Sequence, residues 1–215
     1  MPSSAYAASI KPVLDWLMAF LLLLVLGIPL IAVALLIKLD SRGPAFFFQD
    51  RVGYQGKTIR LIKLRSMTHR PDRVPGEAGE LLGDEPEITR VGRFIRRFRI
   101  DEWPNLFNVL KGEMALVGPR PCLVYMKKEF DAYGRRRLDV LPGCTGLAQT
   151  HGAIHLPWPQ RWRYDAYYVD HISLLLDVHI LLRTLVVVLH DGKKHLVEFD
   201  RFLATRDPDW SLKQD

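Results

Sequence analysis

The sequence predicts an α+β fold that is mainly helical, with a small β-hairpin, amphipathic helices and a membrane-embedded N-terminal helix. Residues 16–37 contain no charged side chain, residues 46–64 resemble two strands around a turn, and helical patterns prevail in the charged remainder. We therefore divide the 215 residues into a membrane element, residues 1–40, and one folded domain, residues 41–215.

The N-terminal apolar segment is long enough to cross a bilayer, since its 22 residues exceed the roughly 20 that a spanning helix needs. The apolar run is too long for a cleaved signal peptide, and no small-residue cleavage site follows it. Pro29 predicts a kink or a break, because proline removes a backbone donor. Lys11 precedes the segment and Lys38 follows it, and cations favour the cytoplasmic side. Two arrangements remain open: a kinked spanning helix, and a re-entrant helix that is broken at Pro29 and returns to the same side.

A β-hairpin is predicted next, with strands over Phe46 to Phe48 and Ile59 to Leu64 and the turn-rich "VGYQGK" between them. The stretch "GYQGKT" resembles the end of a nucleotide-binding P-loop. However, Arg51 stands where that motif requires glycine, and the residues that follow alternate like a strand instead of starting a helix. We therefore reject a P-loop.

The rest of the chain is predicted to consist of helices and loops. The expected elements are a surface loop (70–87), a basic helix (88–98), a short helix ending at Gly112, rigid irregular chain (116–121), an amphipathic helix interrupted at Gly134 (122–140), a loop (141–152) and an apolar helix (172–190). In the last helix, Ser173, Asp177 and Thr184 form one polar stripe, which predicts a core helix or one lying at the membrane surface.

Composition narrows the partners of the protein. The net charge of +6 favours an anionic partner, which could be nucleic acid, phospholipid headgroups or phosphorylated small molecules. Cys122 and Cys144 have neither the number nor the spacing of a disulfide framework or a zinc motif. In "HGAIH", His151 and His155 stand beside glycine and close to a proline, off any regular helix, which argues against a metal site there.

The stretch "RIDEWPN" contains two adjacent carboxylates, Asp101 and Glu102. In one interpretation they start a helix, with Asp101 as its N-cap and Pro104 in the first turn. In the other they belong to a site for an anionic ligand, because helix N-termini also bind phosphate.

Cations near the pair in sequence, or expected near it in space, favour the second interpretation. These are Lys63, Arg65, Arg96, Arg97, Arg99 and Arg120. A carboxylate in such a positive site is expected to keep a low pKa and can attack phosphorus to form an acyl phosphate. Its neighbour can hold Mg²⁺, which usually takes one or two carboxylates together with substrate phosphates.

The block "DEWPNLFNVLKGEMALVGPRP" closely resembles the central block of the bacterial sugar transferases, the monotopic polyprenyl-phosphate phosphoglycosyl transferases. The resemblance extends over nearly the whole chain through "GPAFFFQDRVG", "LPGCTGLAQTHG" and "YDAYYVDHISLLLDVHILLRT". It implies an enzyme of the sugar-phosphate transferase class. Such an enzyme moves a phosphosugar from a UDP-sugar to polyprenyl phosphate, such as undecaprenyl phosphate, and releases UMP in the first membrane step of bacterial glycoconjugate or exopolysaccharide synthesis.

The resemblance also implies roles for individual residues. Asp101 would be the nucleophile and Glu102 would assist with Mg²⁺. Arg96 and Arg120 match phosphate or nucleotide contacts of the family, and Lys63 and Asp165 match other polar positions of its active site.

The family's membrane element is a re-entrant helix broken at a proline that usually follows a serine. In this chain Ile28 precedes Pro29, so no serine hydroxyl contributes to the break. Residues 41–215 would be the catalytic domain, on the cytosolic face of the bacterial inner membrane, in a minimal form that lacks the multi-span region of larger members. Membrane lipid is an implied partner, while downstream glycosyltransferases and a second copy of the chain remain open.

One alternative is a non-catalytic, membrane-anchored basic module that binds anionic lipid or scaffolds glycosyltransferases. Nucleic acid is not favoured, because no recognition motif is present and the apolar segment argues against it.

Overall fold

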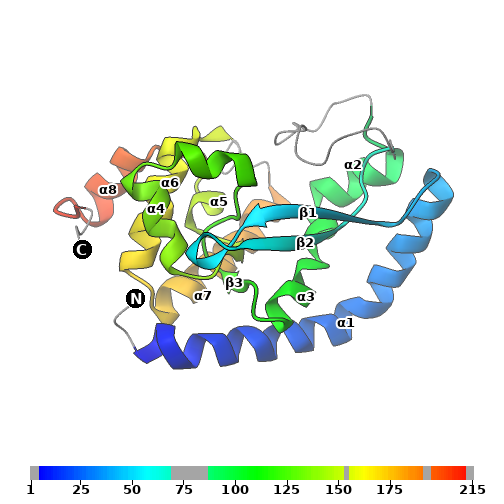
Figure 1. Cartoon of the computed structure of the whole chain (residues 1–215), viewed down its shortest axis with the longest axis horizontal. Coiled ribbons are helices and arrows are strands. Elements are labelled where there is room, and N and C mark those ends of the chain that lie inside the picture. Colours follow the sequence, from blue (N-terminus) through cyan, green and yellow to red (C-terminus); the bar gives the residue numbers. More distant parts are fainter. Residues whose placement is uncertain (1–4, 69–86, 153–154, 191–194, 212–215) are drawn as a thin grey trace.

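A computed structural model of the chain describes residues 5–68, 87–152, 155–190 and 195–211. Nearly all of the surface loop predicted at 70–87 therefore lies outside the described residues. The described fold is mainly helical with two small sheets (Figure 1). This agrees with the predicted fold class.

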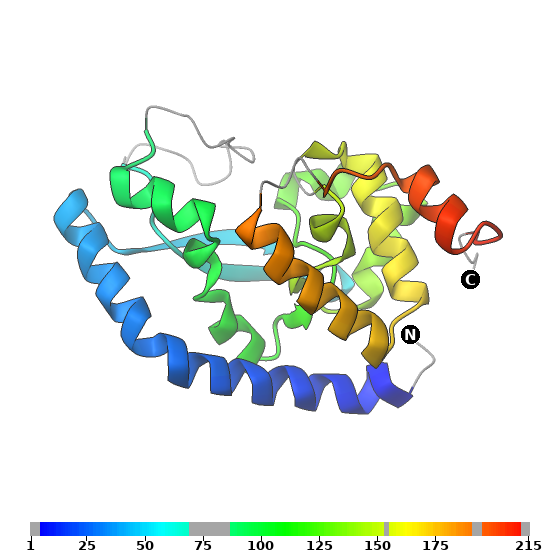
Figure 2. The same cartoon turned by 180° about the vertical axis from the view of Figure 1, so that it is seen from behind.

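The first long element is α1 (Lys11–Asp40), which follows a single wide turn over Tyr6–Ile10. The chain remains helical through Pro29, so α1 is continuous and not interrupted there. The helix is nevertheless strongly curved: it runs along one edge of the molecule and then bends toward the hairpin (Figures 1 and 2). Among the described residues, Tyr6–Asp40 is the one helical stretch long and apolar enough to cross a membrane.

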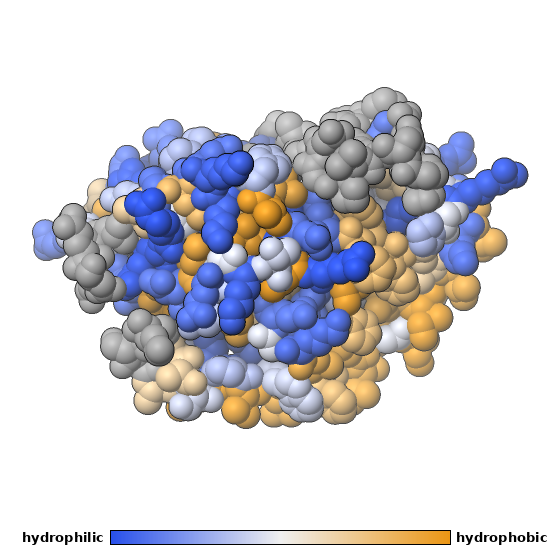
Figure 3. Space-filling model, in the orientation of Figure 1, coloured by the Kyte–Doolittle hydropathy of each residue, from blue (hydrophilic) through white to orange (hydrophobic). Residues whose placement is uncertain are grey.

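Most of α1 is exposed, although it also contributes to the core. Ala19, Leu30 and Ile37 are buried against the rest of the chain, whereas Val25 and Ile28 are 72% and 80% exposed. Apolar side chains gather on the side of the molecule that α1 forms (Figure 3). Such a large apolar surface is a sign of a membrane or protein contact.

Both ends of α1 are hydrogen-bonded to the same folded domain. Near the N-terminal end, the Lys11 Nζ lies 2.8 Å from Asp177 Oδ2 and 3.1 Å from Asp15 Oδ2. At the C-terminal end, the Arg65 guanidinium donates to the carbonyl oxygens of Ile37, Ser41 and Arg42, at 3.2, 2.7 and 2.6 Å. The last carbonyls of a helix have no partner within it, so Arg65 completes this end of α1.

The predicted hairpin is confirmed as β1 (Phe46–Val52) and β2 (Thr58–Leu64), which pair antiparallel with Phe47 opposite Lys63. The turn uses positive φ at Gln55 and Gly56, at 55° and 71°. The lysine and threonine of "GYQGKT" therefore lead into a strand and not into the helix that a P-loop requires.

The acidic pair lies between two helices, both of which were predicted. In α2 (Arg90–Arg97), Thr89 Oγ1 caps the first turn by accepting from the Gly92 amide at 3.0 Å. The chain then makes a separate 3₁₀ turn, Ile100–Glu102, before α3 (Asn105–Leu110). The interpretation of Asp101 as an N-cap is therefore wrong, because α3 begins three residues beyond the acidic pair and no side chain caps it.

A second sheet was not predicted. The strands β3 (Ala115–Val117) and β4 (Gly143–Thr145) pair in parallel, and α5 (Leu147–Thr150) follows directly. The expected loop at 141–152 is thus partly strand and partly helix. Backbone meets backbone here, since a Cβ on Gly143 would lie 2.1 Å from the Gly118 amide nitrogen.

The segment between these strands is not the single helix expected with a break at Gly134. It forms a 3₁₀ segment (Val124–Glu129), the helix α4 (Ala132–Arg136) and a 3₁₀ turn (Arg137–Asp139). Gly134 lies inside α4, where its amide donates to the capping Asp131 Oδ1 at 2.7 Å. The break comes just before that cap.

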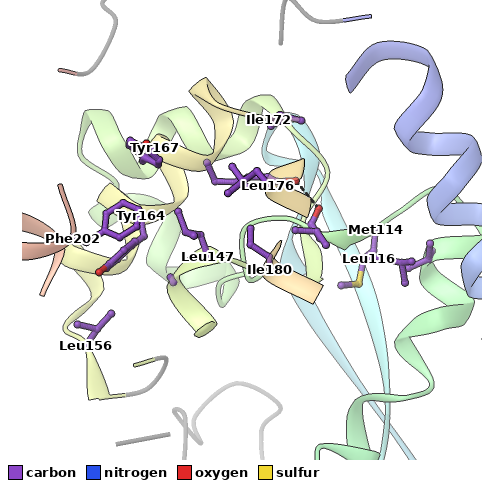
Figure 4. Close-up of a cluster of buried hydrophobic side chains, with 14 of the residues drawn as sticks. Met114, Leu116, Leu147, Leu156, Tyr164, Tyr167, Ile172, Leu176, Ile180 and Phe202 are labelled. Carbon is purple, nitrogen blue, oxygen red and sulfur yellow. Dashed lines mark hydrogen bonds between the residues drawn. The ribbon is translucent and has the colours of Figure 1, made fainter. Parts of the chain in front are cut away.

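The C-terminal part consists of α6 (Trp158–Asp170), α7 (Leu174–Leu189) and α8 (Phe199–Arg206). Their inner faces share one core with β3 and α5, which includes Tyr164, Leu147 and Ile180 (Figure 4). Two members of the predicted polar stripe of α7 face inward, since Asp177 is buried and Thr184 Oγ1 lies 2.7 Å from Thr145 Oγ1. The third, Ser173, is exposed and caps the first turn of α7.

Candidate active site

The acidic pair is held next to two other parts of the fold. The 3₁₀ turn that contains Asp101 and Glu102 lies against β2 through Lys63 and against the segment after β3 through Arg120. Arg99, just before the turn, adopts the left-handed conformation with φ of 56°, which costs a non-glycine residue about 1 kcal/mol. This reversal separates the acidic pair from α2.

Glu102 is bound by two cations. Lys63 Nζ donates to Glu102 Oε1 at 3.0 Å, and Arg120 bonds both oxygens, at 2.7 Å to Oε1 and 3.2 Å to Oε2. A two-pronged arginine contact of this kind is stronger and more directional than a single bond. Burial by itself would raise the pKa of Glu102, but Arg120 and Lys63 outweigh it and hold that pKa well below its ordinary value.

Asp101 has a different environment. Burial, together with the negative charge of Glu102, raises the pKa of Asp101 to about 6, although Lys63, Arg99 and Arg96 oppose the shift. The low pKa expected for a carboxylate in this site is therefore correct for Glu102 and wrong for Asp101. The difference arises because Arg120 and Lys63 bond directly to Glu102 and not to its neighbour.

Two buried polar atoms, one in the acidic pair and one on an arginine near it in sequence, have no partner in the described part of the chain. They are Asp101 Oδ1 and Arg96 Nη1. Buried polar groups are nearly always hydrogen-bonded, so each such exception calls for an explanation. A carboxylate oxygen is complementary to a metal ion or an electrophile. A guanidinium nitrogen is complementary to an anion.

Arg120 also lines an open pocket, with about 340 Å³ of empty space when the part open to solvent is included. The described residues that line this arginine pocket are Arg99, Arg120, Arg137, Ala148, Gln149, Trp158, Arg161 and Asp165. Arg137 connects its walls: it forms an ion pair with Asp165 at 3.0 Å and donates to the Arg120 carbonyl oxygen. The pocket therefore contains four cations and one carboxylate next to the acidic pair.

The structure brings together most of the residues that the sequence singled out. The acidic pair is in contact with Lys63 and Arg120. Asp165 lines the same pocket as Arg120. Arg65 does not belong to this group, because its guanidinium is bonded to the carbonyls at the end of α1.

Two further residues considered in the sequence, Arg97 as a site cation and His151 as a metal ligand that was not favoured, have other environments. Arg97 is exposed and packs over the Phe98 ring at 5.7 Å. His151, weighed above as a metal ligand, has a buried ring that is 2.8 Å from the Leu147 carbonyl oxygen and stacks on Tyr164. In the part of the chain that the structure describes, no group of three histidine, cysteine or acidic side chains could hold a metal.

Sequence reasoning did not identify Arg137, Gln149, Trp158 and Arg161 as site residues. Arg137 ends the run "RRR", which has the composition of a solvated helix surface, and Gln149 belongs to a segment predicted as a loop. The other two stand close to Asp165 on α6, one turn or two before it, so a helical reading of "WPQRWRYD" would have pointed to them.

The acidic pair fits the requirements of Mg²⁺ if substrate phosphates supply the remaining oxygens. A carboxylate has about four lone-pair sites, and Glu102 uses three of them for Lys63 and Arg120, which leaves one on Oε2. Asp101 adds a buried oxygen that has no partner among the described residues. Mg²⁺ commonly takes only one or two carboxylates.

The fold and the site define a protein with an apolar N-terminal helix, two adjacent carboxylates that differ in hydrogen bonding and pKa, and an adjoining cationic pocket. Such a site suits group transfer on an anionic substrate. The model of the family described as bacterial sugar transferase matches residues 6–191. The chain belongs to this family and is a transferase.

Curated relatives agree with this assignment. An uncharacterized sugar transferase of Bacillus subtilis, EpsL, is 39% identical over 92% of this chain and 98% of its own length. A UDP-glucose:undecaprenyl-phosphate glucose-1-phosphate transferase of Caulobacter vibrioides is 41% identical over 83% of this chain and 69% of its own.

A UDP-N-acetylgalactosamine-undecaprenyl-phosphate N-acetylgalactosaminephosphotransferase of Aeromonas hydrophila is 38% identical over 88% of this chain. The match covers only 45% of that relative's own length. The chain thus spans nearly all of the Bacillus relative and less than half of the Aeromonas one.

Proposed function

We propose that the protein transfers a phosphosugar from a UDP-sugar to polyprenyl phosphate, such as undecaprenyl phosphate, through a covalent intermediate on Asp101. Relatives of similar identity are named for this type of transfer. The product would be a polyprenyl-diphosphate sugar, the starting lipid of a bacterial glycoconjugate or exopolysaccharide.

The reaction has two displacement steps. The Asp101 carboxylate attacks the sugar-bearing phosphorus of the donor, the bond from that phosphorus to the bridging oxygen breaks, and UMP leaves. A phosphate oxygen of the lipid then attacks the same phosphorus, the acyl–phosphate bond breaks, and the free carboxylate returns. Arg96 and Arg120 would bind the phosphate oxygens and stabilise the charge that develops on them.

The observation that carries this proposal is the unequal hydrogen bonding of the two carboxylates. Both oxygens of Glu102 accept hydrogen bonds from cations, whereas Asp101 keeps a buried oxygen that no described residue occupies. A carboxylate tied down by three bonds is a poor nucleophile, and one with an unbonded oxygen is available to attack. Glu102, through its remaining lone pair, would help to hold Mg²⁺, which neutralises phosphate charge when bound.

The test is UMP release by the purified protein with undecaprenyl phosphate, Mg²⁺ and a panel of UDP-sugars. A panel is needed because similar relatives are named for different sugars. Asp101→Asn should reduce turnover by about 10³-fold or more, since nothing replaces the nucleophile. Asp209→Asn, at an exposed position beyond α8, is the matched control and should keep full activity.

Two results would contradict the proposal: no turnover of any UDP-sugar by the wild-type protein, or full activity of Asp101→Asn. The second would also be expected of a non-catalytic basic module. Mass spectrometry of protein quenched after mixing with the correct donor alone should find the phosphosugar adduct on the peptide that contains Asp101.

We further propose that α1 is a re-entrant membrane helix and that the remaining chain lies on the cytosolic face of the inner membrane. The support is that both ends of α1 bond to one folded domain, through Lys11 and Asp177 at one end and Arg65 at the other. A helix that spans a bilayer would place its two ends on opposite sides. The bend of α1 and its exposed apolar side chains suit a helix that enters one leaflet and returns (Figures 2 and 3).

Cysteine labelling tests this arrangement. Ile10→Cys and Leu39→Cys, which are exposed near the two ends of α1, should both react with an impermeant maleimide from the cytosolic side. Ile28→Cys, exposed in the middle, should be protected from both sides. Labelling of the two ends from opposite sides would establish a spanning helix instead.

A further inference from the structure

The arginine pocket has the charge and position of a nucleotide site. It contains four guanidinium groups and one carboxylate, Asp165, which is already paired with Arg137 at 3.0 Å. Arg120 belongs to both sites: it bonds Glu102 and also lines the pocket. An anionic ligand whose reacting phosphorus lies at the acidic pair would therefore extend into this pocket.

One wall of the pocket is flat and can stack against a planar ring. The Arg161 guanidinium lies over the Trp158 ring, 4.3 Å from its centroid, and the Arg161 Nε donates to the Leu156 carbonyl oxygen at 2.7 Å. The guanidinium is thus held in place against an aromatic face. Proteins that bind single nucleobases use stacking on aromatic rings and on arginine planes in this way.

A second wall of the pocket includes the side-chain amide of Gln149, whose oxygen and nitrogen can be told apart. Gln149 Nε2 donates to the Cys144 carbonyl oxygen at 3.2 Å, and this bond identifies the other amide atom, Oε1, as the acceptor. Gln149 Oε1 is buried and has no partner among the residues that the structure describes. The pocket therefore contains an acceptor that requires a donor from a ligand.

We propose, on the basis of the function proposed above, that the arginine pocket binds the nucleoside monophosphate half of the donor and that Gln149 reads its base. The ring N3 of uracil carries a hydrogen and donates to Gln149 Oε1. The same atom of cytosine is an acceptor and faces Oε1 unfavourably.

The experiment measures the affinity of the full-length protein in detergent for UMP, CMP and inorganic pyrophosphate by calorimetry. The wild-type protein should bind UMP at least about 10-fold more tightly than CMP. Gln149→Leu should weaken UMP binding about 10-fold, leave CMP and pyrophosphate nearly unchanged, and so remove the preference. Trp158→Leu should weaken UMP and CMP alike and spare pyrophosphate, because only the base loses its stacking surface.

Gln160→Leu is the matched control. Gln160 is another glutamine whose Oε1 is buried without a partner among the described residues, and it does not line the pocket. This variant should bind all three ligands as the wild-type protein does. A thermal melt of each variant establishes folding, and if Gln149→Leu does not fold, the wild-type preference and Trp158→Leu still decide the matter.

Equal binding of UMP and CMP by the wild-type protein would overturn the inference. So would a Gln149→Leu protein that changes its preference among UDP-sugars while its UMP affinity stays the same, because the pocket would then hold the sugar. These outcomes differ from a failure of the proposed function, which would be a wild-type protein without turnover of any UDP-sugar, whatever its affinity for UMP.

Discussion

At the scale of single residues, the two adjacent acids of this protein differ because of a few contacts. Glu102 receives three hydrogen bonds from Lys63 and Arg120, and its pKa is held low. Burial raises the pKa of Asp101 to about 6, and the negative charge of Glu102 contributes to the same shift. The different hydrogen bonding and pKa of the two acids thus follow from burial and from which carboxylate the cations contact, and they underlie the separate roles proposed above.

The pKa shift predicts how Asp101 titrates. In protein free of divalent cations, the Asp101 carboxyl should lose its proton near pH 6 instead of near 4, as followed by carbon NMR of labelled aspartate. Because the folded-state pKa is raised, ionisation of Asp101 makes folding less favourable as pH rises from about 4 to about 6. If Asp101 is the nucleophile, as proposed, its reactive carboxylate form increases as the pH rises from about 4 to about 6, and activity should increase with it.

Glu102→Gln tests the cause of the shift. It removes the negative charge that helps to raise the pKa of Asp101, so the midpoint should fall toward 4. Saturating Mg²⁺ should lower the midpoint of the wild-type protein in the same direction. A midpoint near 4 in the metal-free wild-type protein would contradict the burial of this group.

Sequence patterns identified the acidic pair and its cations but could not assign each cation to its partner. Lys63 and Arg65 are two residues apart, and both belong to a basic strand-like segment. One of them reaches Glu102 and the other the end of α1. This choice depends on where α1 ends in space, and no local pattern contains that information.

At the scale of elements, a helix or strand could be predicted from the sequence when the contacts that stabilise it are local. The hairpin and the helices α2, α3 and α7 are close to their predicted positions, because alternation, turn residues and helical period are properties of neighbouring residues. The pair β3 and β4 was missed, since each strand has three residues and their partners are far apart in the chain. The structure joins them through glycines that allow close backbone contact.

Gly143→Ala tests the importance of that contact. The added Cβ would lie 2.1 Å from the Gly118 nitrogen and 2.4 Å from the Thr145 oxygen, so the strands must separate. We expect a loss of about 1–3 kcal/mol in the free energy of unfolding. UMP release should also fall, because Arg120 is two residues from Gly118 and would move away from Glu102.

The matched control is Gly27→Ala, where an added Cβ has no atom within 4 Å. Chemical denaturation in detergent and the UMP assay compare the two variants. Equal stability and equal activity of both would mean that the β3–β4 contact does not position Arg120.

At the scale of the whole molecule, a buried polar cluster connects the first helix to the last part of the fold. Asp177 on α7 accepts hydrogen bonds from Lys11 at 2.8 Å, Tyr6 at 2.7 Å and Tyr168 at 2.7 Å. The Tyr168 hydroxyl also lies 3.1 Å from the Val117 carbonyl oxygen of β3. The N-terminal end of α1 is thereby linked to the strand that precedes Arg120.

Lys11→Met tests this connection. It leaves the buried Asp177 carboxylate and the half-buried Asp15 carboxylate without their cation, and breaking a buried pair costs about 3–5 kcal/mol. The melting temperature in detergent should therefore fall by several degrees, and adding Asp177→Asn should recover part of the loss. Lys38→Met, at an exposed position near the other end of α1, should leave the melting temperature unchanged. Equal melting temperatures for the two lysine variants would show that the cluster does not stabilise the fold.

The residues at the end of β2 link the acidic pair to the end of α1, and this link determines where the lipid substrate must bind. Lys63 contacts the acidic pair, and Arg65, just past the strand, holds the last turn of α1, where that helix rejoins the folded domain. Two residues of extended chain measure about 7 Å. If α1 lies in the bilayer as proposed, the reacting carboxylate is fixed at the depth of the lipid headgroups. A polyprenyl phosphate could then react without withdrawing its chain from the hydrocarbon, and insertion of two residues between Lys63 and Arg65 should abolish transfer to the lipid while sparing nucleotide binding.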